Sequence, residues 1–304
     1  MLQHFNTLEE LTEAFPDEQS CIRHFRSIRW VNGPFCPYCG STKIYYFADD
    51  KTHKCGDCRQ RFSIKVGTLF EDTKLPLRKW FIAIWLITSH KKGIASTQLA
   101  RDVGVTQKTA WFMTHRLREA AKTKSFNKPL SGMVEIDETF VGGKEGNKHE
   151  WKRRHAGPTA GKTAVFGMLE RDGDLRTMKV ADLSAKTVQG KVVEHVEPNS
   201  NIMSDESASY VGLEGRFYHH TVNHSLGEYV RDYFCHVNGL EGAWSHFKRQ
   251  VFGIHHWISA KHLDRYLDEF TWRYNRRDEK EGDRVNAMLA AAHGKRITYP
   301  QLIE

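Results

Sequence analysis

The sequence predicts a mixed α/β protein in which a small metal-binding ribbon and a helical region precede a larger α/β domain. Three observations support this prediction: four regularly spaced cysteines, helical hydrophobic spacing over residues 76–120, and alternating strand-like and helix-like segments from residue 132 onward. A chain of 304 residues has room for two or three such units.

Residues 1–30 are expected to form an N-terminal helical segment, because Phe5, Leu8, Leu11 and Phe15 recur at helix-like intervals. The segment is acidic and lacks the basic-then-apolar order of a signal peptide. No apolar run in the chain reaches the ~18 residues that a membrane span needs, so we expect no membrane partner.

Residues 31–70 are expected to form a zinc ribbon. The cysteine spacing is C-x2-C-x15-C-x2-C, in which each pair supplies two thiolates and the fifteen intervening residues allow one hairpin. Four thiolates leave no open coordination position, so Zn²⁺ would be structural and would stabilise a module too small for its own core. The ligands would be Cys36, Cys39, Cys55 and Cys58.

Two glycines adjoin the cysteine pairs of this ribbon. Gly40 and Gly56 stand where tight turns favour a positive φ, and we expect that conformation at both. After the second pair, residues 61–66 alternate between polar and apolar side chains as a strand does.

The overall composition favours a polyanionic partner inside the cell. A net charge of +8 and a pI near 9.1 point most simply to nucleic acid. The two cysteines outside the ribbon, Cys21 and Cys235, lie far apart and show no pairing pattern, so a reduced cytoplasm fits best.

Residues 71–120 are expected to form a helix-turn-helix region. Ser96 would cap the first helix, Gly104 would allow the turn and Thr106 would cap the second helix. The start of the second helix is where such a motif reaches base edges. The candidate DNA contacts there are Gln107, Lys108 and Thr109. The alternative is a plain helical hairpin that links two domains.

A linker and an α/β domain are expected to follow. Residues 121–131 are polar and basic and contain a proline, as linkers do; residues 132–280 would form the α/β domain and residues 281–304 a C-terminal tail. The element order would be three strands, helix, strand, helix, strand and two helices. The expected strands are 133–137, 163–169, 175–180, 201–205 and 216–222.

Two aspartates and one glutamate are candidates for a catalytic site. Asp137 and Asp205 each end a predicted strand, where open α/β sheets place active sites. Glu241 lies on a predicted helix, and Asn238 and Lys248 share its face of that helix. Three carboxylates could hold a pair of Mg²⁺ ions for phosphoryl transfer. Each alone could be an ordinary surface charge, but their position, order and spacing agree.

The neighbouring acidic residues are expected to be secondary. Glu135 and Glu138 flank Asp137, and we expect them on the opposite face of the strand from it. Glu206 stands beside Asp205 and is expected to be secondary as well.

The chain resembles the DDE-type transposases of bacterial insertion sequences, in the zinc-ribbon group often called ISXO-like. The resemblance covers most of the chain and is carried by several motifs together. The matching segments are Cys36–Phe62, residues 134–144, residues 204–210, and residues 238–277 with Trp244, Gly253 and the run from His262 to Arg277.

The resemblance implies a ribonuclease-H-like catalytic domain in which Asp137 and Asp205 are the metal-binding aspartates. Relatives carry Asn, His or Glu at the third position, followed by a Lys. Asn238 and Glu241 are both available here, and we favour Glu241 because a carboxylate is the better Mg²⁺ ligand. Mn²⁺ is expected to substitute for Mg²⁺.

The same resemblance implies a function. The protein would bind the terminal inverted repeats of an insertion sequence, cleave the DNA there and join the freed 3′-OH to target DNA. Because two ends must be brought together, we expect a homo-oligomer, and a bacterial cytoplasmic, nucleoid-associated location. Basic residues expected along the DNA path are Lys152, Arg153, Arg154, Lys162 and Arg249.

Two alternatives stay open at this point. The ribbon and the helix-turn-helix alone could make a non-catalytic DNA-binding regulator, although such a protein needs neither the acidic set nor Lys248. A metal-dependent nuclease without strand transfer would use the same carboxylates. The basic run near residue 152 could also be no more than a charged loop.

Overall fold

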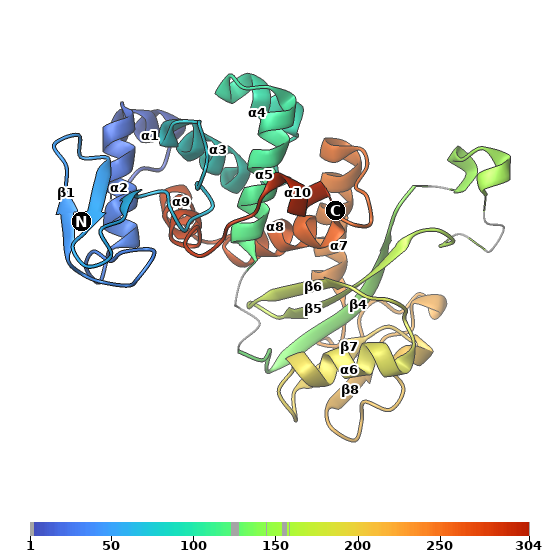
Figure 1. The fold of residues 1–304 in the computed structure, drawn as a ribbon. Coiled ribbons are helices and arrows are strands. Elements are labelled where there is room, and N and C mark those ends of the chain that lie inside the picture. Colours follow the sequence, from blue (N-terminus) through green and yellow to red (C-terminus); the bar gives the residue numbers. More distant parts are fainter. Residues whose placement is uncertain (1–2, 123–127, 144, 154–156, 158, 304) are drawn as a thin grey trace. The chain divides into compact units, whose positions relative to one another are not determined.

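The computed structural model describes residues 3–122, 128–143, 145–153, 157 and 159–303. The chain forms two compact units (Figure 1). Unit 1 comprises Met1–Lys122 with Arg276–Glu304, and unit 2 comprises Thr123–Asn275. None of the helices in the described ranges is both long and apolar enough to cross a membrane.

The helices of unit 1 surround one apolar helix. Helix α3 (Leu77–Ser89) is buried on nearly every side and packs against α1 (Leu8–Ala14), α2 (Glu18–Arg29), α4 (Ser96–Val103), α5 (Gln107–Ala121) and α9 (Glu281–Ala290). A helix that is apolar all round is expected at such a central position. The expected N-terminal helical segment is present as the two helices α1 and α2.

Local capping explains where α1 and α2 begin. The Thr7 side chain accepts a hydrogen bond from the Glu10 amide, and Asp17 forms a capping box with Ser20. The rings of Phe5 and Phe15 meet edge to face at 5.6 Å and close the core beneath these helices.

The C-terminal segment expected as a tail is instead part of unit 1. Residues 281–304 contain α9 and α10 (Tyr299–Ile303), and α9 buries Val285, Met288 and Leu289. The Leu69 amide donates to the Ala292 carbonyl at 2.9 Å. The reason is hydrophobic: α9 carries an apolar face that α2, α3 and α5 cover.

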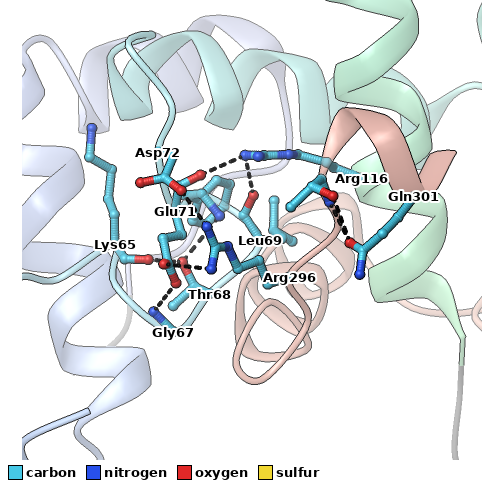
Figure 2. A network of polar contacts seen from close by, with 11 residues as sticks. Lys65, Gly67, Thr68, Leu69, Glu71, Asp72, Arg116, Arg296 and Gln301 are labelled. Atoms are coloured by element: carbon cyan, nitrogen blue, oxygen red, sulfur yellow. Dashed lines mark hydrogen bonds and ion pairs between the residues drawn. The ribbon is translucent and has the colours of Figure 1, made fainter. Parts of the chain in front are cut away.

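Charged side chains hold this C-terminal segment to the chain that follows the ribbon (Figure 2). The buried Arg116 of α5 donates to the backbone carbonyls of Leu69 and Glu71 at 2.7 and 3.0 Å. Arg296 pairs with Glu71 at 3.3 Å and with Asp72 at 2.6 Å. Unit 1 is therefore built from both ends of the sequence.

The ribbon is a three-stranded antiparallel sheet in the order β1-β2-β3. Its strands are β1 (Ile44–Tyr46), β2 (Thr52–Cys55) and β3 (Arg61–Ser63), so the last strand is shorter than the expected 61–66. His53 and Phe62 are paired in the ladder and buried, and the Trp30 ring meets His53 edge to face at 4.9 Å.

Helices α4 and α5 are joined by a tight turn. Gly104 takes the left-handed conformation at φ 63°, and the Thr106 side chain caps α5 by accepting from the Thr109 amide. The expected cap at Ser96 is absent, because Ser96 is the first helical residue and Ala95 stands at the cap position. Leu99, Ala110 and Met113 are buried between the two helices and their neighbours.

Unit 2 contains a five-stranded mixed sheet in the order β6-β5-β4-β7-β8. Strands β4 (Met133–Val141), β5 (Thr163–Glu170) and β6 (Leu175–Lys179) are antiparallel neighbours, whereas β7 (Asn201–Ser204) and β8 (Tyr218–Thr221) add in parallel beyond β4. The sheet confirms the expected mixed α/β character of this part of the chain.

Helices cover both faces of this sheet (Figure 1). Helix α6 (Ala185–His195) joins β6 to β7 and packs on the face that contains Ile136 and Phe166. Helices α7 (Asn238–Gln250) and α8 (Leu263–Asn275) pack on the face that contains Val165 and Leu169. Adjacent strand residues thus serve opposite cores, as the two-residue period of a strand requires.

One expected helix of unit 2 is absent. Only a single 3₁₀ turn, η4 (Ala208–Tyr210), lies between β7 and β8. Its Tyr210 is fully buried and fills the core beside Leu213 and Phe217, so the apolar residues of this segment fill a corner without forming a helix.

Gly167 of β5 allows α7 to approach the sheet. A Cβ at this position would lie 2.4 Å from Cζ2 of the buried Trp244. We expect Gly167→Ala to destabilise the protein by about 3 kcal/mol, at the upper end for an overpacked core. Gly190→Ala on the exposed side of α6 meets nothing within 4 Å and should stabilise by ~0.5–1 kcal/mol. Urea unfolding of both variants tests this; equal stabilities would contradict it.

Candidate active site and zinc centre

The four ribbon cysteines form a compact thiolate cluster. Their Sγ atoms all lie within 4.8 Å of one another, with Cys36–Cys58 and Cys39–Cys55 at 3.6 Å. Tetrahedral Zn²⁺ with Zn–S bonds of ~2.3 Å requires sulfur–sulfur separations of ~3.8 Å, so the cluster fits zinc. Among the described residues it is the single group of three or more potential ligands at such spacing.

The backbone of the two cysteine turns matches the expectation at one glycine and differs at the other. Gly40, after Cys39, has φ 76°, and the residue in the same place after Cys58 is Arg59, at φ 63°. Gly56 has no positive φ. It is needed for close approach, since its amide donates to the Lys43 carbonyl at 2.7 Å and a Cβ would meet Lys43 Cβ at 3.1 Å.

The outer face of the ribbon combines cations with an aromatic ring. Tyr45, Lys54 and Arg61 are paired across the three strands, and the side chain of Arg61 lies 5.0 Å over the Phe47 ring. Tyr45 is 60% exposed. This row stands on the opposite face from the buried His53 and Phe62, so it is open to a partner.

The two candidate aspartates lie at the same edge of the unit 2 sheet. Asp137 is in β4, and Asp205 directly follows β7. These strands are parallel, with Glu135 opposite Met203. Extending that register by two residues places Asp137 opposite Asp205, so the sheet itself brings the two carboxylates to one place.

Negative charges converge on Asp137. The pKa of its carboxyl group is raised to about 7, chiefly by burial and then by the charges of Glu138, Asp205 and Glu241, against the opposing effect of the hydrogen bond from the Glu138 amide. Carboxylates from β4, β7 and α7 therefore interact electrostatically. A buried carboxylate surrounded by like charges is a favourable environment for a cation.

Helix α7 presents the third set of candidates. Asn238, Glu241, Lys248 and Arg249 are all exposed along it. Among the described residues, the side chains of Lys248 and Arg249 have no polar partner, so they are accessible to a ligand. His224, from the turn before α7, lies 3.9 Å from Glu241 Oε1, and its Nε2 is buried without a hydrogen bond.

Glu135 lies on the same face of β4 as Asp137. Residues 135 and 137 are two apart, so they share a strand face, and the expectation of opposite faces was wrong for Glu135. Its side chain is 1% exposed, and Oε2 accepts a hydrogen bond from the Leu240 amide at 2.9 Å. Oε1 pairs with Arg171 at 3.0 Å and with His236 at 3.3 Å.

This contact supplies the N-cap that α7 lacks. The residue at its cap position is Val237, whose side chain cannot accept a hydrogen bond. The Glu135 carboxylate satisfies the amide of Leu240 and lies at the positive end of the helix dipole. Glu135 thus connects the strand of Asp137 directly to the helix of Glu241, and the period of two in strand 133–141 was the signal that could have revealed it.

The other acidic neighbours have structural partners. Glu138 points to the α6 face, as expected, and accepts a hydrogen bond from the Tyr210 hydroxyl group. Burial raises the pKa of Glu138. Glu206 accepts hydrogen bonds from the amides of His224 and Ser225, at 2.9 and 3.0 Å. The hydrogen bond from the Ser225 hydroxyl group is the main cause that lowers the Glu206 pKa to about 2.

The candidate basic residues are only partly available. Lys152 lies 4.4 Å over the exposed Trp151 ring, and Arg153 donates to the carbonyls of Lys148 and Gly146 at 2.9 Å. Arg154 lies outside the described residues. Lys162 is half-buried and packs beside Gly142, where a Cβ would come within 3.1 Å of its Cα.

The candidate base contacts at the start of α5 have partners within unit 1. Gln107 donates to the Ser96 hydroxyl group at 3.0 Å, and Lys108 lies 5.0 Å over the Tyr299 ring. Thr109 is half-buried and shares a hydrogen bond with the Thr106 hydroxyl at 2.8 Å. Gln107 and Lys108 remain exposed, as expected.

Comparison with known proteins identifies the family. The family model for the ISXO2-like transposase domain matches residues 129–275, and that for the transposase zinc-ribbon domain matches residues 16–61. The chain belongs to the ISXO2-like transposase family. The sequence-based family assignment and the zinc ribbon are therefore confirmed.

Two relatives extend this family assignment. An uncharacterized protein in transposable element ISH50 of Halobacterium salinarum is 27% identical over 276 residues, which cover 86% of this chain and 92% of the relative. An uncharacterized transposase-like protein of Haemophilus influenzae is 30% identical over 105 residues, which cover 34% of this chain and 83% of the relative.

A solved structure of another transposase has only a weak likeness to this family member. It is that of a pre-cleavage Mos1 transpososome, with 13% identity, a TM-score of 0.25, and coverage of 73% of this chain and 81% of that one. A TM-score this low is too small to establish a shared fold.

Zinc removal should unfold the ribbon. Cys55→Ser deletes a buried ligand, and we expect the purified variant to lose bound zinc and the ribbon to become protease-sensitive, because metal binding supplies the folding energy of such modules. Cys21→Ala, at a buried cysteine outside the cluster, should keep its zinc. Metal analysis and limited proteolysis measure both; a Cys55→Ser protein with full zinc content would contradict the assignment.

Loss of the Glu135 cap should destabilise unit 2. Glu135→Ala leaves Arg171 without its buried partner and the start of α7 uncapped, so we expect a loss of about 3 kcal/mol, against a smaller loss for Glu135→Gln. Glu194→Ala, at an exposed pair with Lys191, should change the free energy of unfolding by less than ~0.5 kcal/mol.

Hydrogen exchange of the amides in the first turn of α7 gives a local measurement of the same cap, and these amides should exchange faster in Glu135→Ala. Unchanged exchange in Glu135→Ala would refute the capping role.

Proposed function

We propose that this protein is the transposase of an insertion sequence, which binds the terminal inverted repeats, cleaves the DNA and joins the 3′ end to a target. The observation that carries the proposal is the convergence of negative charge on the half-buried Asp137 from Asp205 and Glu241, which lie on different elements. A protein that only bound DNA would gain nothing from three mutually repelling carboxylates, because they destabilise the fold.

Asp137, Asp205 and Glu241 would hold the catalytic metal, with Asn238 as the alternative to Glu241. Oxygen donors suit Mg²⁺, and Mn²⁺ would substitute. When bound, such a cation supplies charge stabilisation at the phosphate and a more acidic water. The parallel register of β4 and β7 fixes the two aspartates, and Glu135 fixes the start of α7 relative to them.

Lys248 would bind a DNA phosphate or the leaving oxygen. It lies seven residues after Glu241, two turns along the same face of α7, and is exposed without a polar partner among the described residues. Arg249 follows it and would contact the neighbouring phosphate. Both side chains are exposed and would be accessible to the substrate.

DNA recognition would come from unit 1. The turn between α4 and α5 presents Gln107, Lys108 and Thr109 in the manner of a helix-turn-helix, and binding would exchange their present partners for DNA. The ribbon row of Tyr45, Lys54 and Arg61 offers phosphate contacts beside an aromatic ring. Lys152, Arg153, Arg154 and Lys162 would add charge near the catalytic residues.

Binding should weaken steeply with salt, since phosphate contacts release counterions. Two ends must be held together for transposition, so the active form would be a homo-oligomer. The Lys and Arg excess of the chain, 45 against 37 acidic residues, fits such a partner.

The test is Mg²⁺-dependent cleavage of DNA that carries the element's end. Wild type should cut, and Asp205→Ala should bind equally well without cutting. Asp137→Asn should also be inactive, yet its metal-free form should melt no lower than wild type, because a buried charge is removed. Glu197→Gln, at an exposed carboxylate of unit 2, is the matched active control.

The outcomes separate the alternatives. Binding without cleavage by wild type would favour a regulator. Cleavage without transfer of a labelled 3′-OH end to a plasmid would favour a nuclease. Cleavage that survives Asp205→Ala would overturn the site assignment.

A further inference from the structure

The exposed face of α7 changes chemical character along its length. Asn238, Glu241, Ser245 and Lys248 are separated by steps of three and four residues, so they form one stripe on α7, and Phe252 stands four residues further on, in the π-helical turn that continues the helix. The candidate metal ligands Asn238 and Glu241 come first, the ammonium group of Lys248 follows, and the aromatic ring of Phe252 comes last. All members except the half-buried Ser245 are exposed.

Phe252 does not stand alone at the end of this stripe. Its side chain is 58% exposed, and Trp257, five residues later, is 66% exposed. Both rings line one shallow hollow of about 20 Å³, together with Val141, Gly142, Val251 and Ile258. Two large exposed rings that share a hollow form an apolar surface that no described residue of the chain covers.

The backbone holds the two rings in place. A π-helical turn, η6 (Val251–His255), follows α7, and His256 then takes a left-handed conformation at φ 60°. Its ring Nδ1 lies 3.1 Å from the Phe252 carbonyl oxygen. Val251 and Ile258, on either side of the turn, are buried in the core between α7, α8 and the sheet. The rings are thus presented from a fixed base, so a ligand would lose little ordering entropy there.

The surroundings of the hollow favour a nucleic-acid ligand. Lys248 lies one turn before Phe252, and Lys162 packs against Gly142 at the rim. Aromatic rings stack on bases of any sequence, and adjacent cations bind the phosphates of the same strand. A hollow of about 20 Å³ is too small to enclose a base, so a base would lie across its aromatic rim.

We propose that Phe252 and Trp257 form a stacking platform for an unpaired base of the DNA strand held at the carboxylate site. The eleven residues from Glu241 to Phe252 rise ~16 Å along a helix, which matches about five nucleotide steps of ~3.4 Å. The platform would hold an opened DNA end in register with the reacting phosphate. This inference rests on the proposed transposase function.

Photocrosslinking tests the platform in the full-length protein. DNA ends would carry a single 5-iodouracil at successive positions from the cleavage site, bound to Asp205→Ala so that no cutting occurs. We expect crosslinks to the peptide with Phe252 and Trp257 from positions about five nucleotides away. In the Asp205→Ala protein, the added substitution Trp257→Leu should abolish these crosslinks. It should also weaken the binding of a DNA end with an unpaired overhang about tenfold. Trp257→Phe should retain both the crosslinks and the affinity.

Tyr218→Leu, at a 61% exposed ring on β8, is the matched control and should change neither readout. If DNA binds but the crosslinks form at other peptides, and Trp257→Leu binds with unchanged affinity, the stacking proposal is wrong while the proposed function stands. If no protein binds the end, the wild type included, both the platform and the proposed function would be overturned. If Trp257→Leu instead changes only the oligomeric state in sedimentation, the surface contacts a second copy and the inference is wrong.

Discussion

Unit 2 depends on one buried carboxylate that joins a strand to a helix. Glu135 caps α7 across the sheet, and Arg171 compensates its charge. Helix α7 has no cap of its own, so without this contact its first turn would leave amides unsatisfied. The separation between Asp137 and Glu241 is thereby set by a short, rigid connection through the core.

The candidate site is built at the expense of stability. Asp137 is half-buried close to other negative charges, which disfavours its ionised form and raises the pKa of its carboxyl group. Two apolar cores, one on each face of the sheet, offset this loss of stability. The closest part of this packing is at Gly167, where only a residue without a side chain lets Trp244 lie against β5.

Much of this arrangement could be predicted from the sequence. The cysteine spacing predicted the thiolate cluster, and Asp205 directly follows a strand as expected. Asp137 was expected at a strand end but lies in the middle of β4, which continues to Val141. The failures have physical causes. Glu135 was expected on the opposite face of the strand from Asp137, although residues two apart share a face. Gly56 was expected to have a positive φ, but it is needed because a side chain there would clash with Lys43, a tertiary contact that the local sequence does not reveal. The apolar segment around Tyr210 packs into the core without forming the expected helix. Its sequence is compatible with either structure, and the choice depends on tertiary packing.

The return of the C-terminal segment to unit 1 has a consequence for how the chain is made. Residues 276–304 complete unit 1, so unit 2 is an insertion within it. A ribosome releases α9 only after every candidate catalytic residue has been synthesised. Unit 1 therefore cannot finish folding until α9 has been synthesised, and a chain that stopped before α9 would contain the acidic set but only an incomplete unit 1.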